Sequence, residues 1–230
     1  MESKTTTAVV AVVIGLLVGG GAGYAVSTAN QDDHKESMSM EQSTSESNPN
    51  SATKAADLRS TLVTLGVEHM DLTYGAVSST LQGAKSAEAD TADLVKNGED
   101  LAAAVGSIYG EDAEKTFDSV WKLHLNQFVA YATGASKNDD AAKKAALDKI
   151  DAEYTKPLAA YLAKANPNLP EDVLYKSLNQ HVDMTAVMID AQAAGDYESA
   201  TAQRDKAVDH MEMLFSTLAD GIVKQFPKKF

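Results

Sequence analysis

From residue 55 onward, apolar side chains recur at alternating intervals of three and four residues, which is the period of one face of an α-helix. Short breaks divide the pattern at GAKS, YGED, SKND, NPNLPED and AGDYE, where glycine, proline or aspartate can end or cap a helix. The pattern predicts six helices, at 55–84, 87–109, 111–136, 139–165, 170–194 and 197–226, and no β-strand. We therefore expect an all-α domain over residues 55–230, folded as a six-helix bundle.

A weak internal repeat relates the first, third and fifth predicted helices. His69, His124 and His181 follow one another at spacings of 55 and 57 residues. Each occupies an apolar position of its helix, and each lies about a dozen residues from the helix start, which places the three at similar depth along the helix axes. The repeat predicts three helical hairpins, each formed by a histidine-bearing helix and the helix that follows it.

The positions of these histidines suggest a shared site. All three lie on apolar helix faces and should point into the bundle, and His210 lies at the edge of the apolar stripe of the sixth helix. If neighbouring helices are antiparallel, the four imidazoles can share one central layer. Burying such rings costs about 1–3 kcal/mol each unless they are paired, and imidazoles cannot satisfy one another without a proton or a metal between them. The sequence therefore predicts a metal site formed by these four histidines.

Methionines near the histidines extend the predicted ligand set, which adds Met70, Met184, Met188 and Met213. Imidazole and thioether ligands, in a chain without cysteine, favour copper. Zinc held by histidines is an alternative metal. Haem bound noncovalently between helices is a third candidate, although Trp121 and other aromatic residues already occupy the predicted central layer. Met211, at the centre of its apolar stripe, is expected to be a core residue.

A purely structural interpretation of the same residues is also open. A histidine on an apolar face is commonly a hydrogen-bonded core residue, and methionine is common in cores. The domain is then a metal-free scaffold or a protein-interaction module. The chain has no Gly-rich phosphate loop, G-x-S-x-G elbow or H-E-x-x-H motif, so we predict no enzymatic activity. A net charge of −13 argues against binding to nucleic acid.

The N-terminal region predicts export. Residues 8–26, AVVAVVIGLLVGGGAGYAV, have no charge and are about long enough to span a bilayer. Small-x-small patterns around Ser27 fit a cleaved signal peptide, whereas glycines at every fourth position fit a retained spanning helix. We predict a membrane anchor or signal peptide at 1–27 and a disordered linker at 28–54, which has no aromatic residue. The helical domain is expected outside the cytoplasm, either as part of a single-pass membrane protein or secreted.

Five stretches resemble known proteins: VEHMDLTY, AVGSIYGED, WKLHLNQFVAY, NPNLPEDVLYKSLNQHVD and AAGDYESATAQRDKAVDHMEMLFSTLADGIVKQFPKKF. They are similar to stretches of a largely uncharacterised group of exported bacterial all-helical repeat proteins, and the resemblance covers about residues 58–230. Some relatives in that group have a copper amine oxidase label, which we attribute to an additional domain that this chain lacks. The resemblance implies export and an all-helical repeat, and it implies no catalytic residue.

Overall fold

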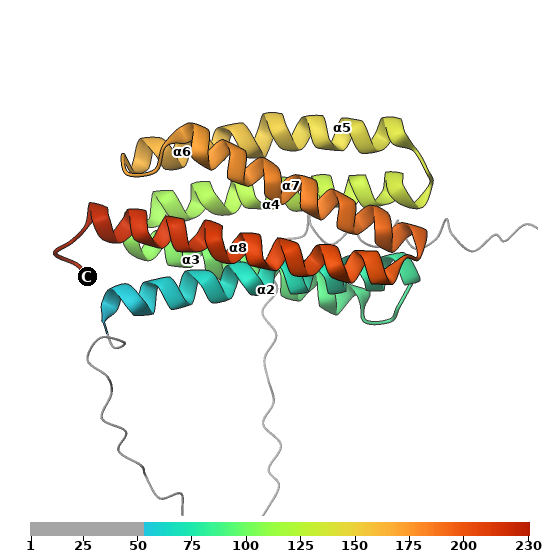
Figure 1. The fold of residues 1–230 in the computed structure, drawn as a ribbon, viewed down its shortest axis with the longest axis horizontal. Helices are drawn as coiled ribbons and strands as arrows, with labels where there is room; N and C mark the ends of the chain where they lie inside the picture. Colours follow the sequence, from blue (N-terminus) through green and yellow to red (C-terminus); the bar gives the residue numbers. More distant parts are fainter. Residues whose placement is uncertain (1–52) are drawn as a thin grey trace, which may run out of the picture.

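The structure, a computed structural model, describes residues 53–230 (Figure 1). It contains the helices α2 (Lys54–Gln82), α3 (Ala87–Tyr109), α4 (Glu111–Ser136), α5 (Asp140–Ile150), α6 (Lys156–Ala165), α7 (Glu171–Ala194) and α8 (Tyr197–Gln225), with a π-helical segment η1 (Asp151–Thr155) joining α5 to α6. No strand occurs within residues 53–230, so the predicted all-α class is confirmed. The predicted membrane or signal segment and almost all of the predicted linker lie outside the described residues.

The helix ends lie within two residues of the predicted ones because the chemistry that sets them is local. Thr53, Asp139 and Asp196 precede α2, α5 and α8, and each side chain accepts a hydrogen bond from the backbone N–H three residues later. Gly83 and Gly195 follow α2 and α7 with φ angles of 63° and 75°. This left-handed conformation is easiest for glycine and ends a helix by turning the chain away.

The predicted helix 139–165 differs from a regular α-helix at η1. Pro157 follows this segment closely and has no N–H to donate to the carbonyl four residues earlier. The hydrogen-bond ladder widens to the π pattern just before the proline, and the helix then continues as α6. Tyr154 and Thr155, at the end of η1, are both buried in the bundle.

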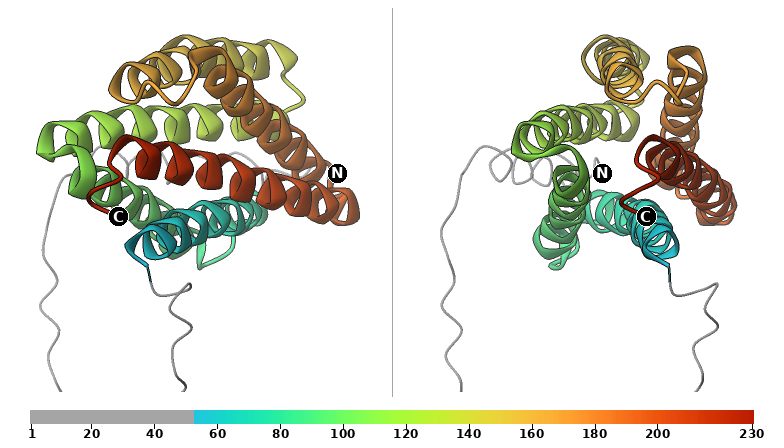
Figure 2. Two further views of the ribbon diagram at one scale, coloured as in Figure 1. Left: turned by 60° about the vertical axis from the view of Figure 1, so that its left-hand side comes forward. Right: turned by 90° about the vertical axis from the view of Figure 1, so that its left-hand side faces the viewer.

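The helices form an inner group and an outer group. α2, α4 and α7 contact one another at the centre, whereas α3 packs on α2 and α4, α8 packs on α7 and α2, and the α5–α6 rod packs on α4 and α7. Apart from α5 and α6, which continue as one rod, consecutive helices run in opposite directions, and Figure 2 shows them side by side around the bundle. The three inner helices are therefore parallel to one another. A residue at the same depth on each of them faces one common centre.

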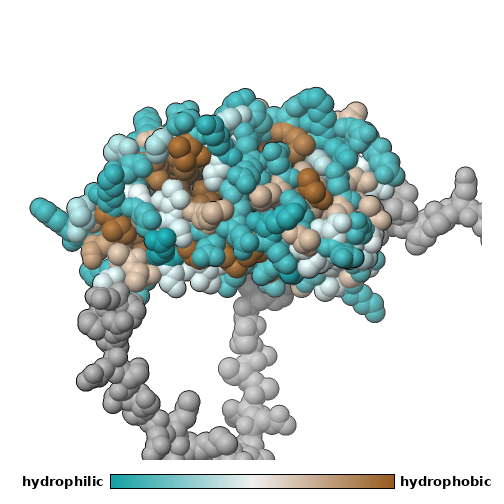
Figure 3. Space-filling model, in the orientation of Figure 1, coloured by the Kyte–Doolittle hydropathy of each residue, from teal (hydrophilic) through white to brown (hydrophobic). Residues whose placement is uncertain are grey.

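The predicted apolar faces form the core. Phe117, Trp121, Phe128 and Tyr131 of α4 are all at most 6% exposed, as the periodicity of the sequence requires. On the face seen in Figure 3, hydrophilic residues predominate and the apolar ones lie in small separate patches. Within residues 53–230, no helix combines the length and the apolar character needed to cross a membrane.

Two glycines of α2 allow a matched test of the packing between α2 and α8. A Cβ atom on Gly66 would overlap the ring of Phe215 of α8, whereas a Cβ atom on Gly75 meets nothing within 4 Å. We expect Gly66→Ala to lower the free energy of unfolding by about 1–3 kcal/mol through overpacking. Gly75→Ala should raise it by up to about 1 kcal/mol through helix propensity. Urea unfolding measures both, and equal stabilisation by the two substitutions would contradict the described contact.

Candidate metal centre

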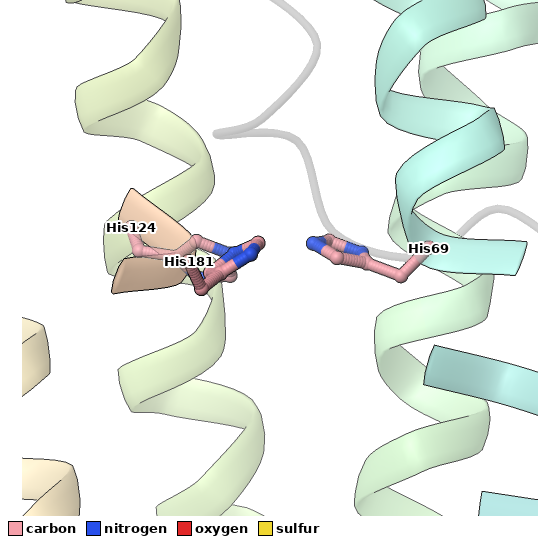
Figure 4. Close-up of side chains that lie close together, drawn as sticks. All are labelled: His69, His124 and His181. Atoms are coloured by element: carbon pink, nitrogen blue, oxygen red, sulfur yellow. The ribbon is translucent and has the colours of Figure 1, made fainter. Parts of the chain in front are cut away.

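Three of the four predicted histidines converge at the centre of the bundle. His69 of α2, His124 of α4 and His181 of α7 point toward one another in Figure 4. Each contributes one ring nitrogen to a group in which all three nitrogens lie within 4.8 Å of one another. Their ring centroids are 5.7, 5.8 and 6.4 Å apart. The side chains are 0–1% exposed, so this His triad is shielded from bulk water.

The tautomer of His124 follows from one hydrogen bond. Its Nδ1 contacts the backbone carbonyl oxygen of Trp121, which can only accept, so Nδ1 has the proton and donates it. The lone pair is then on Nε2, which is buried and has no hydrogen-bond partner among the described residues. A metal-binding histidine commonly has this arrangement, with one N–H held by a carbonyl and the other nitrogen free.

The other two members also have unpaired ring nitrogens. Both nitrogens of His181, and Nδ1 of His69, are buried without a hydrogen-bond partner in the described part of the chain. Leaving one such buried group unpaired costs about 1–3 kcal/mol. In native proteins, such an unpaired group is commonly explained by a functional role, by an ordered water or by a bound ion.

Burial keeps the three imidazoles neutral. It lowers the pKa of His69 from 6.5 to about 4, while the nearby Asn97 side chain opposes the shift. The pKa values of His124 and His181 are also well below 6.5, first because of burial and then because a positive charge on one ring would repel a charge on the next. At neutral pH all three therefore offer lone pairs, which is the protonation state that a metal requires.

The spacing of the nitrogens suits a first-row transition metal after a small adjustment. Three imidazole nitrogens at ~2.0–2.1 Å from a tetrahedrally coordinated ion lie about 3.4 Å from one another. Nitrogens up to 4.8 Å apart must therefore approach one another by up to about 1.4 Å. Side-chain rotation can supply this change without moving the helices.

Aromatic rings hold the triad in place on one side. Trp121 packs edge-on against His69 at 4.9 Å and against His124 at 4.7 Å between ring centroids. Tyr154 stacks on His124 at 4.3 Å, with an angle of 20° between the rings. Tyr154 was not among the residues predicted for the site. Pro157 was the only local signal of the π segment that directs this residue inward.

His210, the predicted fourth member, does not belong to this group. Its Nε2 lies 2.9 Å from the backbone carbonyl oxygen of Ser177. The reason is the position of α8, which packs on α7 and α2 from outside the inner group, so His210 reaches the backbone of α7 before it reaches the centre. The expected closed layer of four imidazoles is therefore not formed.

The four predicted methionine ligands lie in different environments. Met70 and Met188 are fully buried, Met184 is partly buried, and Met213 is 61% exposed. Met211 is 1% exposed, as expected for a core residue. No methionine is among the residues that line the cavity next to the triad. A role of these methionines as ligands stays a prediction.

A cavity of about 440 Å³ adjoins the triad, and all three histidines contribute to its wall. It extends toward the end of the bundle where α2 and α4 finish, and its lining there includes the exposed residues Gln82 and Gly83. Apolar side chains form much of the wall, including Ala76, Val77, Leu94, Leu125, Phe128 and Val129. The triad thus has a protein-filled side, at Trp121 and Tyr154, and an open side.

No carboxylate of residues 53–230 joins the site. Asp71, Asp183 and Asp209, which lie within two residues of a histidine in sequence, are exposed, and so is Glu153 of η1. The candidate ligands in the described part of the chain are therefore neutral.

Comparisons with protein-family models, curated proteins and solved structures found no match, so the resemblance to exported helical proteins stays a prediction.

Proposed function

We propose that this protein binds one transition-metal ion through His69, His124 and His181, and that the ion is copper in preference to zinc. The observation on which the proposal depends is the convergence of three buried neutral imidazoles from three parallel helices, with one ring nitrogen of each within 4.8 Å of the other two. Imidazole ligands suit both metals. For a given set of nitrogen ligands, divalent copper binds more tightly than divalent zinc. The predicted N-terminal segment would place this site outside the cytoplasm.

The metal-free alternative is less well supported by the same contacts. A histidine that serves only as core needs hydrogen-bond partners for its nitrogens, because burial removes water from them. His210 has such a partner for Nε2 in the carbonyl of Ser177, although its Nδ1 has none, whereas His181 has none on either ring nitrogen within residues 53–230. A metal ion would bind one nitrogen from each ring, and so would provide a partner for Nε2 of His124 and for one of the two nitrogens of His181. The second nitrogen of His181 stays without a partner in either interpretation.

The chain provides its own probe for copper. Trp121 is its single tryptophan and lies against the rings of both His69 and His124. Divalent copper bound by these rings should quench the tryptophan fluorescence by more than half, because a paramagnetic ion at this distance deactivates the excited indole. Zinc, which has a filled d shell, should bind without comparable quenching.

The test is a titration of the full, metal-free chain with Cu(II), Cu(I) and Zn(II), combined with metal analysis after removal of unbound ions. We expect the Cu(II) quenching to end at one equivalent, and we expect prior loading with zinc to delay it. Full quenching that needs many equivalents, or retention of no metal after dialysis, would exclude the proposed site.

A further inference from the structure

The triad has an open side, where its three histidines face the cavity. Three protein ligands leave a metal with at least one coordination position for an outside ligand, as in catalytic zinc sites. The cavity begins at the triad, where His69, His124 and His181 form part of its wall. Trp121 and Tyr154 occupy the other side. An outside ligand would therefore approach through the cavity.

The charge of the site favours an anionic head group on that ligand. Three neutral imidazoles leave the full positive charge of the ion uncompensated in a buried site, and such a charge is costly unless it is paired. No aspartate, glutamate, lysine or arginine lines the cavity within the described residues. The compensating charge must then come with the ligand, and a carboxylate is an oxygen donor with a single negative charge.

The walls of the cavity favour an apolar tail. On α2 the lining extends from His69 to Gly83, which corresponds to roughly 20 Å of helix at 1.5 Å per residue. Thr73 and Thr185, one turn after His69 and His181, donate their hydroxyl protons to the carbonyl oxygens of those histidines. These hydroxyls offer no proton to a ligand. A polar tail would lose hydrogen bonds to water on entry, whereas an aliphatic tail would gain from burial.

We propose that the fourth coordination position takes the carboxylate of an aliphatic carboxylic acid, and that the alkyl tail of this acid lies in the cavity between α2, α3 and α4. This inference rests on the proposed metal site, which supplies the ion that the carboxylate binds. The proposed binding of the alkyl tail rests on the cavity and its apolar lining. No bond is formed or broken in the acid, which binds as an intact ligand.

The experiment compares sodium octanoate with sodium acetate on the copper-loaded full chain. The carboxylate is followed by the visible absorption band of Cu(II) and by calorimetry. Each added methylene group that enters the cavity should tighten binding about three- to fourfold. Octanoate should therefore bind at least a hundredfold more tightly than acetate. Equal affinity of the two acids for the copper-loaded chain would overturn the inference and leave the metal site intact.

Two controls separate the parts of the inference. Ala132→Phe places a large side chain in the cavity wall and should weaken octanoate binding at least tenfold, with copper and acetate affinities unchanged. Val77→Phe, on α2, is the second variant if the first does not fold. If octanoate binds the metal-free chain as tightly as the loaded one, its carboxylate is not on the metal and the inference is wrong. A preceding copper titration without acid reports separately on the proposed function, and the inference falls with that function if no copper binds.

Discussion

Replacing His181 with leucine is expected to lower the copper affinity of the full chain at least a hundredfold, which corresponds to about 2.7 kcal/mol. The reason is that the triad loses one of three ligands, and no further histidine and no carboxylate of residues 53–230 lines the cavity. The same substitution should leave the stability of the metal-free chain unchanged or raise it. It removes two buried nitrogens without partners and substitutes an apolar side chain of similar size. Copper titration and urea unfolding measure the two effects.

His210→Leu is the matched control, because His210 is also buried on a helix but lies outside the triad. Its ring is hydrogen-bonded to the carbonyl of Ser177, so the substitution should lower the free energy of unfolding by about 1 kcal/mol. Copper affinity should change less than threefold. A scaffold without metal predicts the same kind of stability loss for both variants and no difference in copper binding. Equal loss of copper affinity in the two variants would make His210 a fourth ligand.

The metal-free protein is expected to lose stability steeply as the pH falls below about 6.5. The folded-state pKa values of His69, His124 and His181 are all below the ordinary value, chiefly because the rings are buried. The unfolded chain therefore binds more protons than the folded chain below pH 6.5, and acid favours unfolding. Above pH 6.5 the three rings are neutral in both the folded and the unfolded chain, so they cause no loss of stability there. Stability falls as the pH drops below 6.5, and for His69 the fall ends near pH 4, the folded-state pKa of its ring.

The size of the acid effect is large because three groups act together. Each histidine contributes a slope of up to about 1.4 kcal/mol per pH unit, so the three give up to about 4 kcal/mol per unit. Urea unfolding at pH 7.5, 6.0 and 5.0 measures the slope. His181→Leu should reduce it by about a third. Bound copper should raise the free energy of unfolding at each pH without reducing the slope, because metal-bound rings in the folded chain take up no protons. A free energy of unfolding that does not change between pH 7.5 and 5.0 would show that these imidazoles are not buried in the neutral form.

The helices and their inward faces were predictable because they depend on residues that are close in sequence. Capping by Asp139 and Asp196, and the left-handed glycines Gly83 and Gly195, end or begin helices wherever they occur in a suitable pattern. The alternating apolar spacing determines which side of each helix is buried. It therefore also determines that the three repeated histidines face inward.

The register of the triad needed only one further condition, the antiparallel order of consecutive helices. Short connections between helices make this order the expected one. His69, His124 and His181 have similar depth in helices that then run parallel, and the structure brings them within one site. That much of the candidate site could be predicted from the spacing of the repeat.

Tertiary packing alone decided the rest of the site. His210 lies at the edge of the apolar stripe of α8. Which neighbouring helix this edge contacts depends on how α8 packs between α7 and α2. The stacking of Tyr154 on His124 depends on how η1 turns toward α4. The cavity depends on the difference between the volume enclosed by α2, α3 and α4 and the volume of the side chains that fill it. A single sequence determines periodicity and local conformation, but these contacts join residues far apart in the chain, and their geometry arises only when the helices pack.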